Sequence, residues 1–284
     1  MSAVSVFLKE IRVEHTFFAL PFAYTGAVFA AHGVPSSWSL LWITLAVLGA
    51  RTAAMAANRF FDRDIDARNP RTAKRALVSG VLSPGVMIWA IVAGLLLLLY
   101  SAWMLNPLCV KLMPLAALGV LIYPLCKRFT WSTHFILGAV DGLAPLGAYI
   151  GVAGTIALPA ILIFAAVTVW VAGFDIIYAL MDLGVDREQG IASVPSRLGE
   201  TAGRRLPAIL HATMLPLLLG AGWVAHASWW YALGIVAAVA LIVYEERLFV
   251  AAANVFVLNE RVFVANMSFS VLFLATTIAG FTLR

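Results

Sequence analysis

The sequence predicts an all-α membrane protein, and two observations support that prediction: its composition and the placement of its charges. Of its 284 residues, 63% are apolar and 12% are charged. Soluble globular proteins are about 45–50% apolar and about 25% charged. The chain is therefore expected to cross a lipid bilayer repeatedly. The bilayer is its expected surroundings, and no nucleic-acid partner is expected.

Apolar stretches that suit membrane-spanning helices follow one another along the whole chain. Glycines and prolines interrupt several of them, which is tolerated where neighbouring helices satisfy the freed backbone groups. No long polar insertion separates them, so residues 1–284 are expected to form a single transmembrane domain. About nine helices are predicted, at 16–32, 40–57, 86–105, 108–125, 134–153, 157–180, 205–226, 229–250 and 263–282.

The basic residues orient this arrangement. All Lys and Arg residues except Arg51, Lys111 and Arg284 fall on one side of it. The positive-inside rule places that side in the cytoplasm. We therefore expect a protein of the cytoplasmic (inner) membrane, with its N-terminus inside and its C-terminus outside. The first 15 residues lack a cleavable signal pattern, so the first helix is expected to remain. Cys109 and Cys126 would be about 25 Å apart on one helix, too far for a disulfide.

The stretch 51–80 changes from an apolar helix into a loop rich in charged residues. Asn58, Asp62 and Asp66 are spaced by four, so on a helix they fall within an arc of about 80°. Three oxygen-bearing side chains on one face suit a hard divalent cation such as Mg²⁺. Asp64 breaks the spacing and is expected to point elsewhere. The basic residues that follow suit a polyanion held by that metal: Arg68, Arg71, Lys74 and Arg75.

A second stretch, DIIYALMDLGVD at 175–186, repeats this pattern. Asp175, Tyr178, Asp182 and Asp186 again lie within about 80° of one helical face. One such face could be a solvated helix end, but two copies in an apolar chain favour metal sites. The motifs close the second and sixth helices, so both are expected at the same membrane face, as in a parallel repeat.

Ionisable residues inside membrane helices are costly and therefore indicate function. Arg51 shares a helix face with Asn58 and Asp62, which favours binding or orienting the site over snorkelling to the membrane surface. Asp141 lies among small residues, and a substrate contact and a structural hydrogen bond both fit it. Tyr178 fits an orienting or cation-stabilising role and simple packing equally well.

A short basic segment follows the fourth helix. Lys127 and Arg128 come after Tyr123 and Pro124. They could be ordinary positive-inside charges, but on the same membrane face they could also neutralise phosphate oxygens. The five histidines are scattered without ligand spacing, so no histidine metal site is expected. No nucleotide-binding loop or hydrolase motif appears.

These motifs carry a family resemblance. NRFFDRDID resembles the NxxxDxxxD motif, and DIIYALMDLGVD the DxxYxxxDxxxD motif, of the UbiA superfamily of intramembrane aromatic prenyltransferases. The resemblance covers most of the chain, including the intervening YPLCKR. It implies a helical bundle around a central cavity that opens to the cytoplasm and sideways to lipid. It also implies two Mg²⁺ ions that bridge the acidic motifs to a polyprenyl diphosphate.

The resemblance also implies roles for individual residues. The implied Mg²⁺ ligands are Asn58, Asp62 and Asp66 for one ion, and Asp175, Asp182 and Asp186 for the other. The implied catalytic residues are Asp62, Asp175, Asp182, Tyr178 and Arg51. The implied substrate contacts are Arg12, Arg68, Arg71, Lys74, Tyr123, Lys127, Arg128 and Asp141.

Some of these positions match the family more specifically. Arg71 and Lys127 match its basic positions best and are the preferred diphosphate contacts. Asp66 and Asp186 are expected to act through water. Arg12 resembles the basic residue that opens the first helix, a candidate for an acceptor carboxylate.

The implied reaction transfers a polyprenyl group to an aromatic hydroxy acid of quinone biosynthesis. An allylic C–O bond ionises only when the charge of the departing diphosphate is neutralised, which Mg²⁺ with Arg and Lys provides. The allylic cation must then meet an aromatic carbon before water does. A dry cavity with apolar walls provides that exclusion.

Two acceptors are consistent with the resemblance. His15 and Thr16 stand where 4-hydroxybenzoate enzymes usually carry Lys and Pro. RNPRTAKRAL and DREQGIASVPSRLG are similar to a UbiA-like branch that includes menaquinone enzymes of the futalosine route. The acceptor is therefore 4-hydroxybenzoate-like, with 1,4-dihydroxy-6-naphthoate as the alternative.

A membrane transporter is the alternative from a different class. Transporters place their sites near the bilayer midplane at broken helices. The acidic motifs instead crowd the cytoplasmic ends of two helices, which favours the enzyme. A non-catalytic scaffold would not explain two matched acidic faces.

Overall fold

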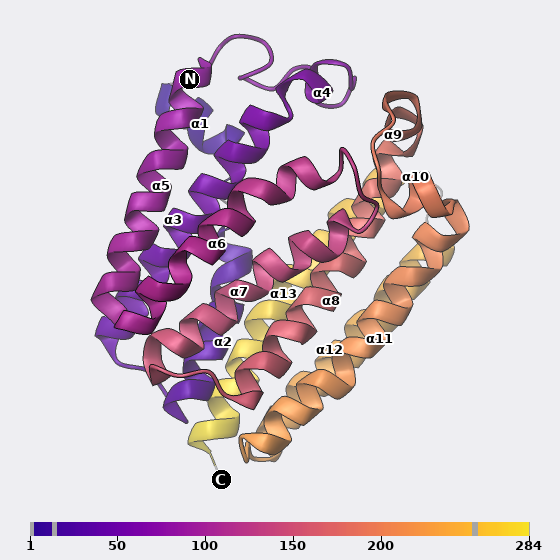
Figure 1. The fold of residues 1–284 in the computed structure, drawn as a ribbon. Coiled ribbons are helices and arrows are strands. Elements are labelled where there is room, and N and C mark those ends of the chain that lie inside the picture. Colours follow the sequence, from indigo (N-terminus) through magenta and orange to yellow (C-terminus); the bar gives the residue numbers. More distant parts are fainter. Residues whose placement is uncertain (1–2, 13–15, 252–254, 284) are drawn as a thin grey trace.

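The protein, seen in a computed structural model, is helical wherever it has regular structure among the described residues, 3–12, 16–251 and 255–283. The helices form one elongated bundle (Figure 1). Their bounds are α1 (Ala3–Glu10), α2 (Thr16–Ala31), α3 (Ser37–Phe61), α4 (Arg63–Ala67), α5 (Pro84–Leu105), α6 (Pro107–Cys126), α7 (Thr133–Ala153), α8 (Leu158–Ala179), the 3₁₀ turn η2 (Leu180–Asp182), α9 (Leu183–Gln189), α10 (Val194–Leu198), α11 (Glu200–Val224), α12 (Trp229–Ala251) and α13 (Val255–Thr282).

The helix lengths confirm an all-α membrane protein. In the described part of the chain, seven helices are long and apolar enough to cross a membrane, and Ala19–Ala31 is a shorter apolar helix. Each of the predicted ranges falls on one long helix. The count of nine crossings stays a prediction. Cys109 and Cys126 are both free, as expected.

Local sequence sets where these helices begin. Ser36 caps α3, and its side chain accepts a hydrogen bond from the Ser39 backbone N–H at 3.1 Å. Asn106 caps α6 by accepting from the backbone N–H groups of Leu108 and Cys109. Its amide also donates to the Ile150 carbonyl at 2.7 Å, so the α5–α6 turn is tied to α7. Such caps satisfy the backbone donors that a helix start leaves free.

The long helices pack mainly as neighbouring pairs, α3 on α5, α7 on α8, α8 on α11, α2 on α7 and α12 on α13. The short helices α1, α4, α9 and α10 lie at the end of the bundle where the chain begins, and the C-terminus lies at the opposite end (Figure 1). The polar segments that follow α3 and α8 therefore share one end. This confirms that the two acidic motifs lie on the same side of the bundle.

The motifs are not continuous helices, and in this respect the sequence-based expectation was wrong. Helix α3 ends at Phe61, and α4 begins at Arg63 after a break at Asp62. In the second motif, α8 ends at Ala179 and a 3₁₀ turn runs to Asp182 before α9. The α-helical course is thus interrupted just before or at the middle aspartate of each motif, and the next short helix begins directly after that aspartate. The short side chain of Asp favours such helix ends because it competes for backbone hydrogen bonds.

Small residues let the helices around the site approach closely. A methyl group placed on Gly49 of α3 would lie 2.6 Å from the Gly94 carbonyl oxygen of α5. One placed on Gly138 of α7 would lie 2.2 Å from the Thr168 carbonyl oxygen of α8. Close backbone approach through small residues is the usual means of packing helices within a membrane.

A buried polar network joins the C-terminal helices to α8. Trp170 of α8 donates to the Asn266 side chain at 2.7 Å, and Asn266 donates to Glu245 at 2.6 Å. His211 Nδ1 lies 2.8 Å from Glu245 Oε2. Because unpaired polar groups are costly in an apolar interior, these contacts fix α11, α12 and α13 against the helix that carries Asp175.

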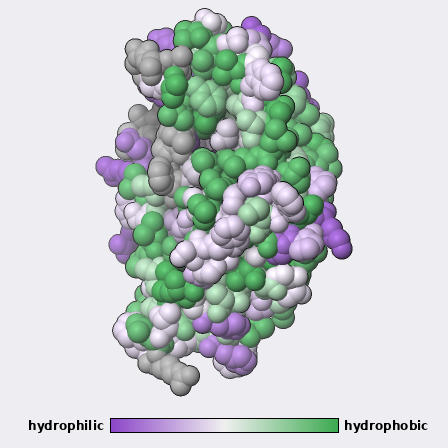
Figure 2. All heavy atoms as spheres, turned by 90° about the vertical axis from the view of Figure 1, so that its left-hand side faces the viewer, coloured by the Kyte–Doolittle hydropathy of each residue, from purple (hydrophilic) through white to green (hydrophobic). Residues whose placement is uncertain are grey.

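The outer surface fits a lipid environment. Figure 2 shows apolar residues over most of one face, with the hydrophilic ones gathered mainly toward its outline. Large apolar side chains such as Trp89, Trp103 and Trp223 are exposed. Exposed apolar area of this extent is expected only where lipid or protein covers it.

We predict that Gly49→Ala destabilises the protein although alanine is the better helix former. The new methyl group would meet backbone atoms of α5, which cannot move like a flexible side chain. Overpacking of this kind costs about 1–3 kcal/mol. Thermal unfolding in detergent measures it, with Gly147→Ala of α7 as the matched control because nothing lies within 4 Å there. Equal melting temperatures for the two variants would contradict the close packing.

Candidate functional site

The first acidic motif lies buried at the end of α3. Asp62 is 2% exposed and Asp66 is 6% exposed, whereas Asp64 is exposed, as the spacing predicted. Asn58 donates from its amide to Asp62 Oδ2 at 3.0 Å. Burial raises the pKa of Asp62, and the nearby ammonium group of Lys127 opposes that rise. The motif therefore needs cations nearby to keep its acids ionised.

Those cations come from other segments of the chain. Lys127, just after α6, places Nζ 2.5 Å from Asp62 Oδ2. Arg75, from the loop after α4, forms an ion pair with Asp66. The sequence grouped Arg75 with the basic loop residues but gave no reason to single it out.

The second motif is tied to the same loop. Arg71 holds Asp182 with two nitrogen–oxygen contacts, Nε to Oδ1 at 3.0 Å and a terminal nitrogen to Oδ2 at 2.5 Å. Asn69 also donates to Asp182 Oδ1 at 3.0 Å. Burial is the largest single effect and lowers the pKa of Arg71, but the hydrogen bond and charge of Asp182, together with the charges of Asp66 and Asp186, raise that pKa overall. The loop after the first motif thus bridges both motifs.

The other two acids of the second motif contact a histidine and a serine rather than Lys or Arg. His134 Nδ1 lies 2.7 Å from Asp175 Oδ2. Ser193 donates its hydroxyl to Asp186 Oδ2 at 2.9 Å. Neither His134 nor Ser193 was predicted, since the sequence showed only scattered histidines and a serine near a proline.

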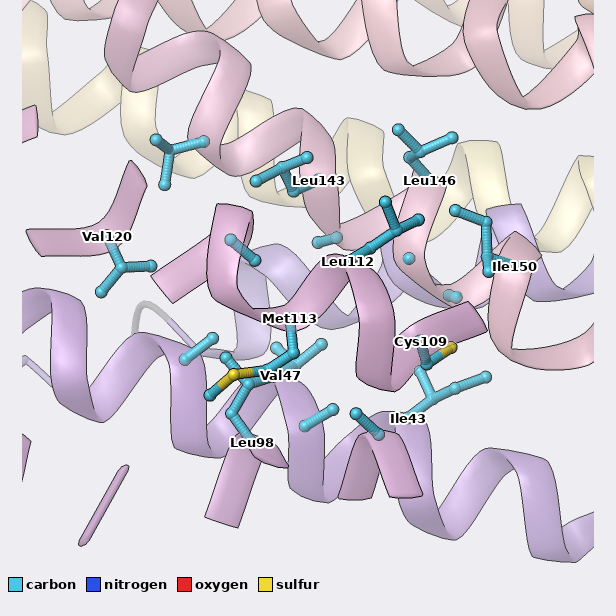
Figure 3. A pocket seen from close by; sticks show the side chains of 18 of the residues that line it. Ile43, Val47, Leu98, Cys109, Leu112, Met113, Val120, Leu143, Leu146 and Ile150 are labelled. Carbon is cyan, nitrogen blue, oxygen red and sulfur yellow. The ribbon is translucent and has the colours of Figure 1, made fainter. Parts of the chain in front are cut away.

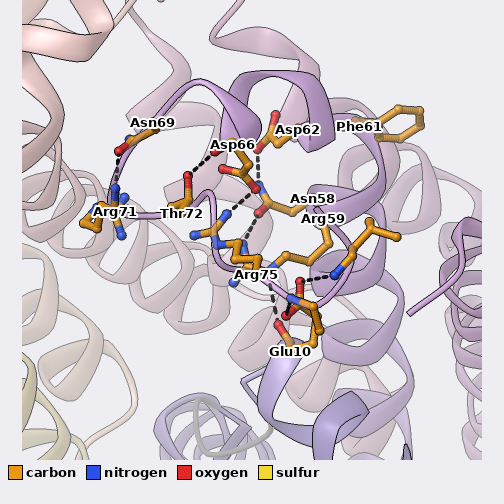
Figure 4. Close-up of polar contacts among 12 residues, drawn as sticks. Glu10, Asn58, Arg59, Phe61, Asp62, Asp66, Asn69, Arg71, Thr72 and Arg75 are labelled. Atoms are coloured by element: carbon orange, nitrogen blue, oxygen red, sulfur yellow. Dashed lines mark hydrogen bonds and ion pairs between the residues drawn. The ribbon is translucent and has the colours of Figure 1, made fainter. Parts of the chain in front are cut away.

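The N-terminal helix anchors the loop (Figure 4). Glu10, at the end of α1, accepts from the Ala76 backbone N–H at 2.9 Å. Arg59 donates to the Glu10 carbonyl at 3.0 Å and to the Asn58 side chain at 3.0 Å. Because Arg59 is only 5% exposed, these bonds fix Asn58 to α1.

Arg51 and Asp141 meet inside the bundle. Their side chains form an ion pair between α3 and α7, with a nitrogen–oxygen distance of 3.3 Å. Both line an apolar cavity of about 320 Å³ between α3, α5, α6 and α7. Along α3 the lining runs from Ala54 past Arg51 to Ile43. Figure 3 shows Val47 and Ile43 of α3 in this wall, with apolar side chains of the neighbouring helices around the cavity. Tyr123 of α6 lies close enough for both charges to act on it.

The remaining predicted residues lie around this centre. Arg68 and Lys74 are exposed on the loop, and Arg68 donates to the Asp64 carbonyl at 3.2 Å. Arg128 donates to the Phe61 carbonyl and so caps the end of α3. Arg12 and Tyr178 lie close enough for the positive charge of Arg12 to act on the Tyr178 hydroxyl. His15 lies outside the described residues.

The acids fit a hard cation by their chemistry. Among the described residues, no three His, Cys, Asp or Glu side chains form a ready group of ligands. Asp62 Oδ1, however, is buried without a hydrogen-bond partner. A buried carboxylate oxygen without a partner is costly, and it is the kind of ligand that Mg²⁺ accepts. The metal ligands stay a prediction.

The chain matches known proteins along most of its length. The model of the UbiA prenyltransferase family matches residues 19–281. A curated relative, "4-hydroxybenzoate octaprenyltransferase" of Shewanella woodyi, is 32% identical over 221 residues, 78% of this chain and 77% of the relative.

Solved structures agree with this. The apo structure of a UbiA homologue from Aeropyrum pernix K1 has a TM-score of 0.84 and 31% identity, and the match covers 94% of this chain and 98% of that one. A UbiA homologue from Archaeoglobus fulgidus, bound to DMAPP and Mg²⁺, has a TM-score of 0.70 at 20% identity over 98% of this chain and 99% of that one. The second likeness shows the fold alone.

We predict that Lys127→Met destabilises the protein by about 2 kcal/mol or more. It leaves the Asp62 carboxylate buried without its cation, and breaking a fully buried pair costs about 3–5 kcal/mol. The loss is smaller here because the Lys127 side chain is 25% exposed. Lys74→Met, at an exposed lysine of the loop, is the control and should change stability by no more than about 0.5 kcal/mol.

The loss of stability caused by Lys127→Met should grow as the pH rises. Without Lys127 the pKa of Asp62 rises further above its unfolded value. A carboxyl with a raised folded pKa loses stability as the pH climbs from its unfolded pKa through the folded one. Melting curves from acid to neutral pH measure this, and a constant deficit would contradict it.

Proposed function

The chain belongs to the UbiA prenyltransferase family, and from this premise we propose that it transfers a polyprenyl group from a polyprenyl diphosphate to an aromatic hydroxy acid. The bond between the allylic carbon and the diphosphate oxygen breaks. A carbon–carbon bond forms ortho to the phenol hydroxyl, and the ring proton leaves. The diphosphate departs with the electron pair of the broken bond.

One observation supports this proposal most strongly: a polar centre and an apolar cavity lie in series in one bundle. The acidic motifs and their cations occupy one end, and the cavity, whose wall includes the Arg51–Asp141 pair, runs along α3 from Ala54 to Ile43. About seven residues of α3, or about 10 Å, separate Arg51 from Asn58. A substrate with a charged head and a long apolar tail matches that order.

The proposed metal ligands are the residues of the two motifs. Asn58, Asp62 and Asp66 would hold one Mg²⁺, and Asp175, Asp182 and Asp186 the other. The UbiA homologue from Archaeoglobus fulgidus binds DMAPP together with Mg²⁺, which supports this chemistry. Mg²⁺ neutralises the charge that builds up on the departing diphosphate.

The cations at the same end are the proposed diphosphate contacts. Lys127 and Arg71 already contact motif acids, and Arg75 contacts Asp66. Their nitrogens are therefore close to the position that an anion bridging the two motifs would occupy. Arg68 and Lys74 are exposed on the same loop and add positive charge there.

The cavity provides the dry surroundings that the reaction needs. Its walls are apolar apart from the Arg51–Asp141 pair at one end. An allylic cation survives there long enough to meet the ring because water is excluded. The ion pair cancels most of its own charge, so it can orient a polar group without drawing water into the cavity. Tyr123 and Tyr178 would line the space between the two regions.

The acceptor class follows from the named relatives. The Shewanella woodyi relative is named for octaprenyl transfer to 4-hydroxybenzoate, which supports an aromatic hydroxy acid here. The alternative is 1,4-dihydroxy-6-naphthoate, which also carries a carboxylate and a hydroxyl. Arg12 is the proposed partner of that carboxylate.

We also propose that the polar end faces the cytoplasm, since it carries most of the basic residues.

The first test is product formation by the purified protein. It is given Mg²⁺, a polyprenyl diphosphate and either 4-hydroxybenzoate or 1,4-dihydroxy-6-naphthoate, with EDTA as a control. We expect prenylation of one ring and its loss with EDTA. Product that persists in EDTA would overturn the metal proposal, and binding of diphosphate without product from either acid would overturn the acceptor class.

We predict that Asp62→Asn lowers kcat/KM at least about 100-fold, because it removes a charged ligand from the first motif. Asp64→Asn is the matched control, since Asp64 lies two residues away but is exposed. It should retain nearly full activity. Equal activity of the two variants would show that the first motif does not act as proposed.

We predict that Ala144→Phe makes the enzyme selective for short prenyl diphosphates. Ala144 lies one turn beyond Asp141 in the cavity wall, so the ring would fill the path of a long tail. We expect kcat/KM for a long-chain diphosphate to fall about tenfold or more, with little change for dimethylallyl diphosphate. Ala212→Phe, at an exposed alanine of α11, is the control. Equal loss with both substrates would argue against the tail path.

A further inference from the structure

We propose that His134 is a positioning residue, which holds the Asp175 carboxylate in its binding orientation while leaving its negative charge intact. The inference rests on the proposed function, because it concerns how a motif acid is presented to a divalent cation. His134 lies in the first turn of α7, is 3% exposed and is not among the residues that line the cavity. It acts through Asp175.

The hydrogen bonds of His134 define its protonation. The Val194 backbone N–H donates to Nε2 at 3.1 Å, so Nε2 carries a lone pair and no proton. Nδ1 lies 2.7 Å from Asp175 Oδ2. If Asp175 donated to Nδ1 instead, the ring would have to be an anion. The ring is therefore neutral, with its one proton on Nδ1, and it donates to Asp175.

This partner differs from those of Asp62, Asp66 and Asp182, whereas Asp186 also has an uncharged partner, the hydroxyl of Ser193. Lys127, Arg75 and Arg71 are cations, and each cancels the charge of the aspartate that it contacts. A neutral imidazole fixes the direction of the Asp175 carboxylate and leaves its charge free. The structure thus gives Asp175 orientation without neutralisation, which is what a carboxylate ligand of a divalent cation requires.

One short segment, residues 192–194, connects His134 to other parts of the polar end. Three successive residues make the contacts: Ala192 N–H donates to the Lys127 carbonyl at 2.8 Å, Ser193 Oγ to Asp186, and Val194 N–H to His134. All three residues are buried. The segment 192–194 therefore links Asp175, Asp186 and the lysine that contacts Asp62.

Local sequence makes this segment rigid. Gly190 ends α9 with φ of 70°, a conformation that favours glycine. Ser193 and Ser196 form a reciprocal capping box at the start of α10, with Pro195 in its first turn. The backbone N–H of Val194 takes no part in the capping box and donates to His134 Nε2 instead. The sequence IASVPS thus fixes the donor that sets the histidine tautomer.

The experiment measures Mn²⁺ binding to the full chain in detergent by electron paramagnetic resonance, with inorganic pyrophosphate present. The variants are His134→Leu, His134→Gln and the exposed-histidine control His226→Gln. Leucine fills the space without any polar atom. Glutamine can accept from Val194 with its oxygen and donate to Asp175 with its amide nitrogen, as the neutral ring does.

We expect His134→Leu to weaken Mn²⁺ binding about 10–100-fold, the usual effect of losing a group that orients a metal ligand. His134→Gln should recover most of it, and His226→Gln should match the unaltered protein. A merely structural histidine would predict equal loss in the leucine and glutamine variants. That result, or unchanged binding in His134→Leu, would overturn the inference.

A double-mutant cycle tests whether His134 acts through Asp175. In the background of Asp175→Asn, adding His134→Leu should change Mn²⁺ binding little, since the oriented carboxylate is already gone. Additive losses would overturn the inference. If His134→Leu does not fold, His134→Asn replaces it, because its shorter amide cannot reach both partners.

The outcomes separate this inference from the proposed function. If the unaltered protein binds no Mn²⁺ with pyrophosphate, the proposed function fails. If it binds Mn²⁺ and the His134 variants bind equally well, only the role of His134 fails.

Discussion

The structure depends on one constraint: carboxylates buried at the end of an apolar bundle must be stabilised by other parts of the chain. Removing a carboxylate from water costs several kcal/mol unless a partner compensates it. Asp62, Asp66 and Asp182 take cations from three different places, the end of α6 and two points in the loop after α4. Each ion pair therefore also fixes the position of a segment. These ion pairs therefore hold the polar end together.

The helix breaks give these acids their common orientation. Asp62 directly follows the end of α3, and Asp182 ends the 3₁₀ turn that follows α8. On an uninterrupted helix, the last acid of each motif would continue along the axis. Asp66 and Asp186, which lie in α4 and α9 beyond these breaks, are both buried. The same arrangement in both motifs agrees with the parallel repeat that the sequence indicated.

The sequence predicted the fold well because membrane helices have a strong and simple signal. Each predicted apolar range became one long helix, and the two motifs lie at one end as the charge pattern required. The motif residues were found because their spacing is regular. The helix breaks were missed, since a four-residue spacing reads as a continuous helix and the propensity of one aspartate is a weak signal.

The partners of the motif acids could not be found in the same way. His134, Ser193 and Asn69 are joined to the acids only by the folded chain, across 41, 7 and 113 positions of sequence. None of them belongs to a repeating pattern. Glu10 likewise gains its role only because α1 folds back onto the loop. Single-sequence analysis finds residues that recur and misses those whose role comes from tertiary contact.

The order of the two regions along the bundle limits how a substrate can lie. A diphosphate cannot enter the apolar cavity without losing its hydration, and the one ion pair there is already compensated. An apolar tail gains nothing from the charged loop. A molecule with both parts therefore has a single favourable orientation, with its head at the motifs and its tail beyond Arg51. In the proposed function, the reactive carbon next to the head would then lie near the boundary between the two regions. There the neutral Arg51–Asp141 pair and Tyr123 supply polar groups without an excess charge that would compete for the diphosphate.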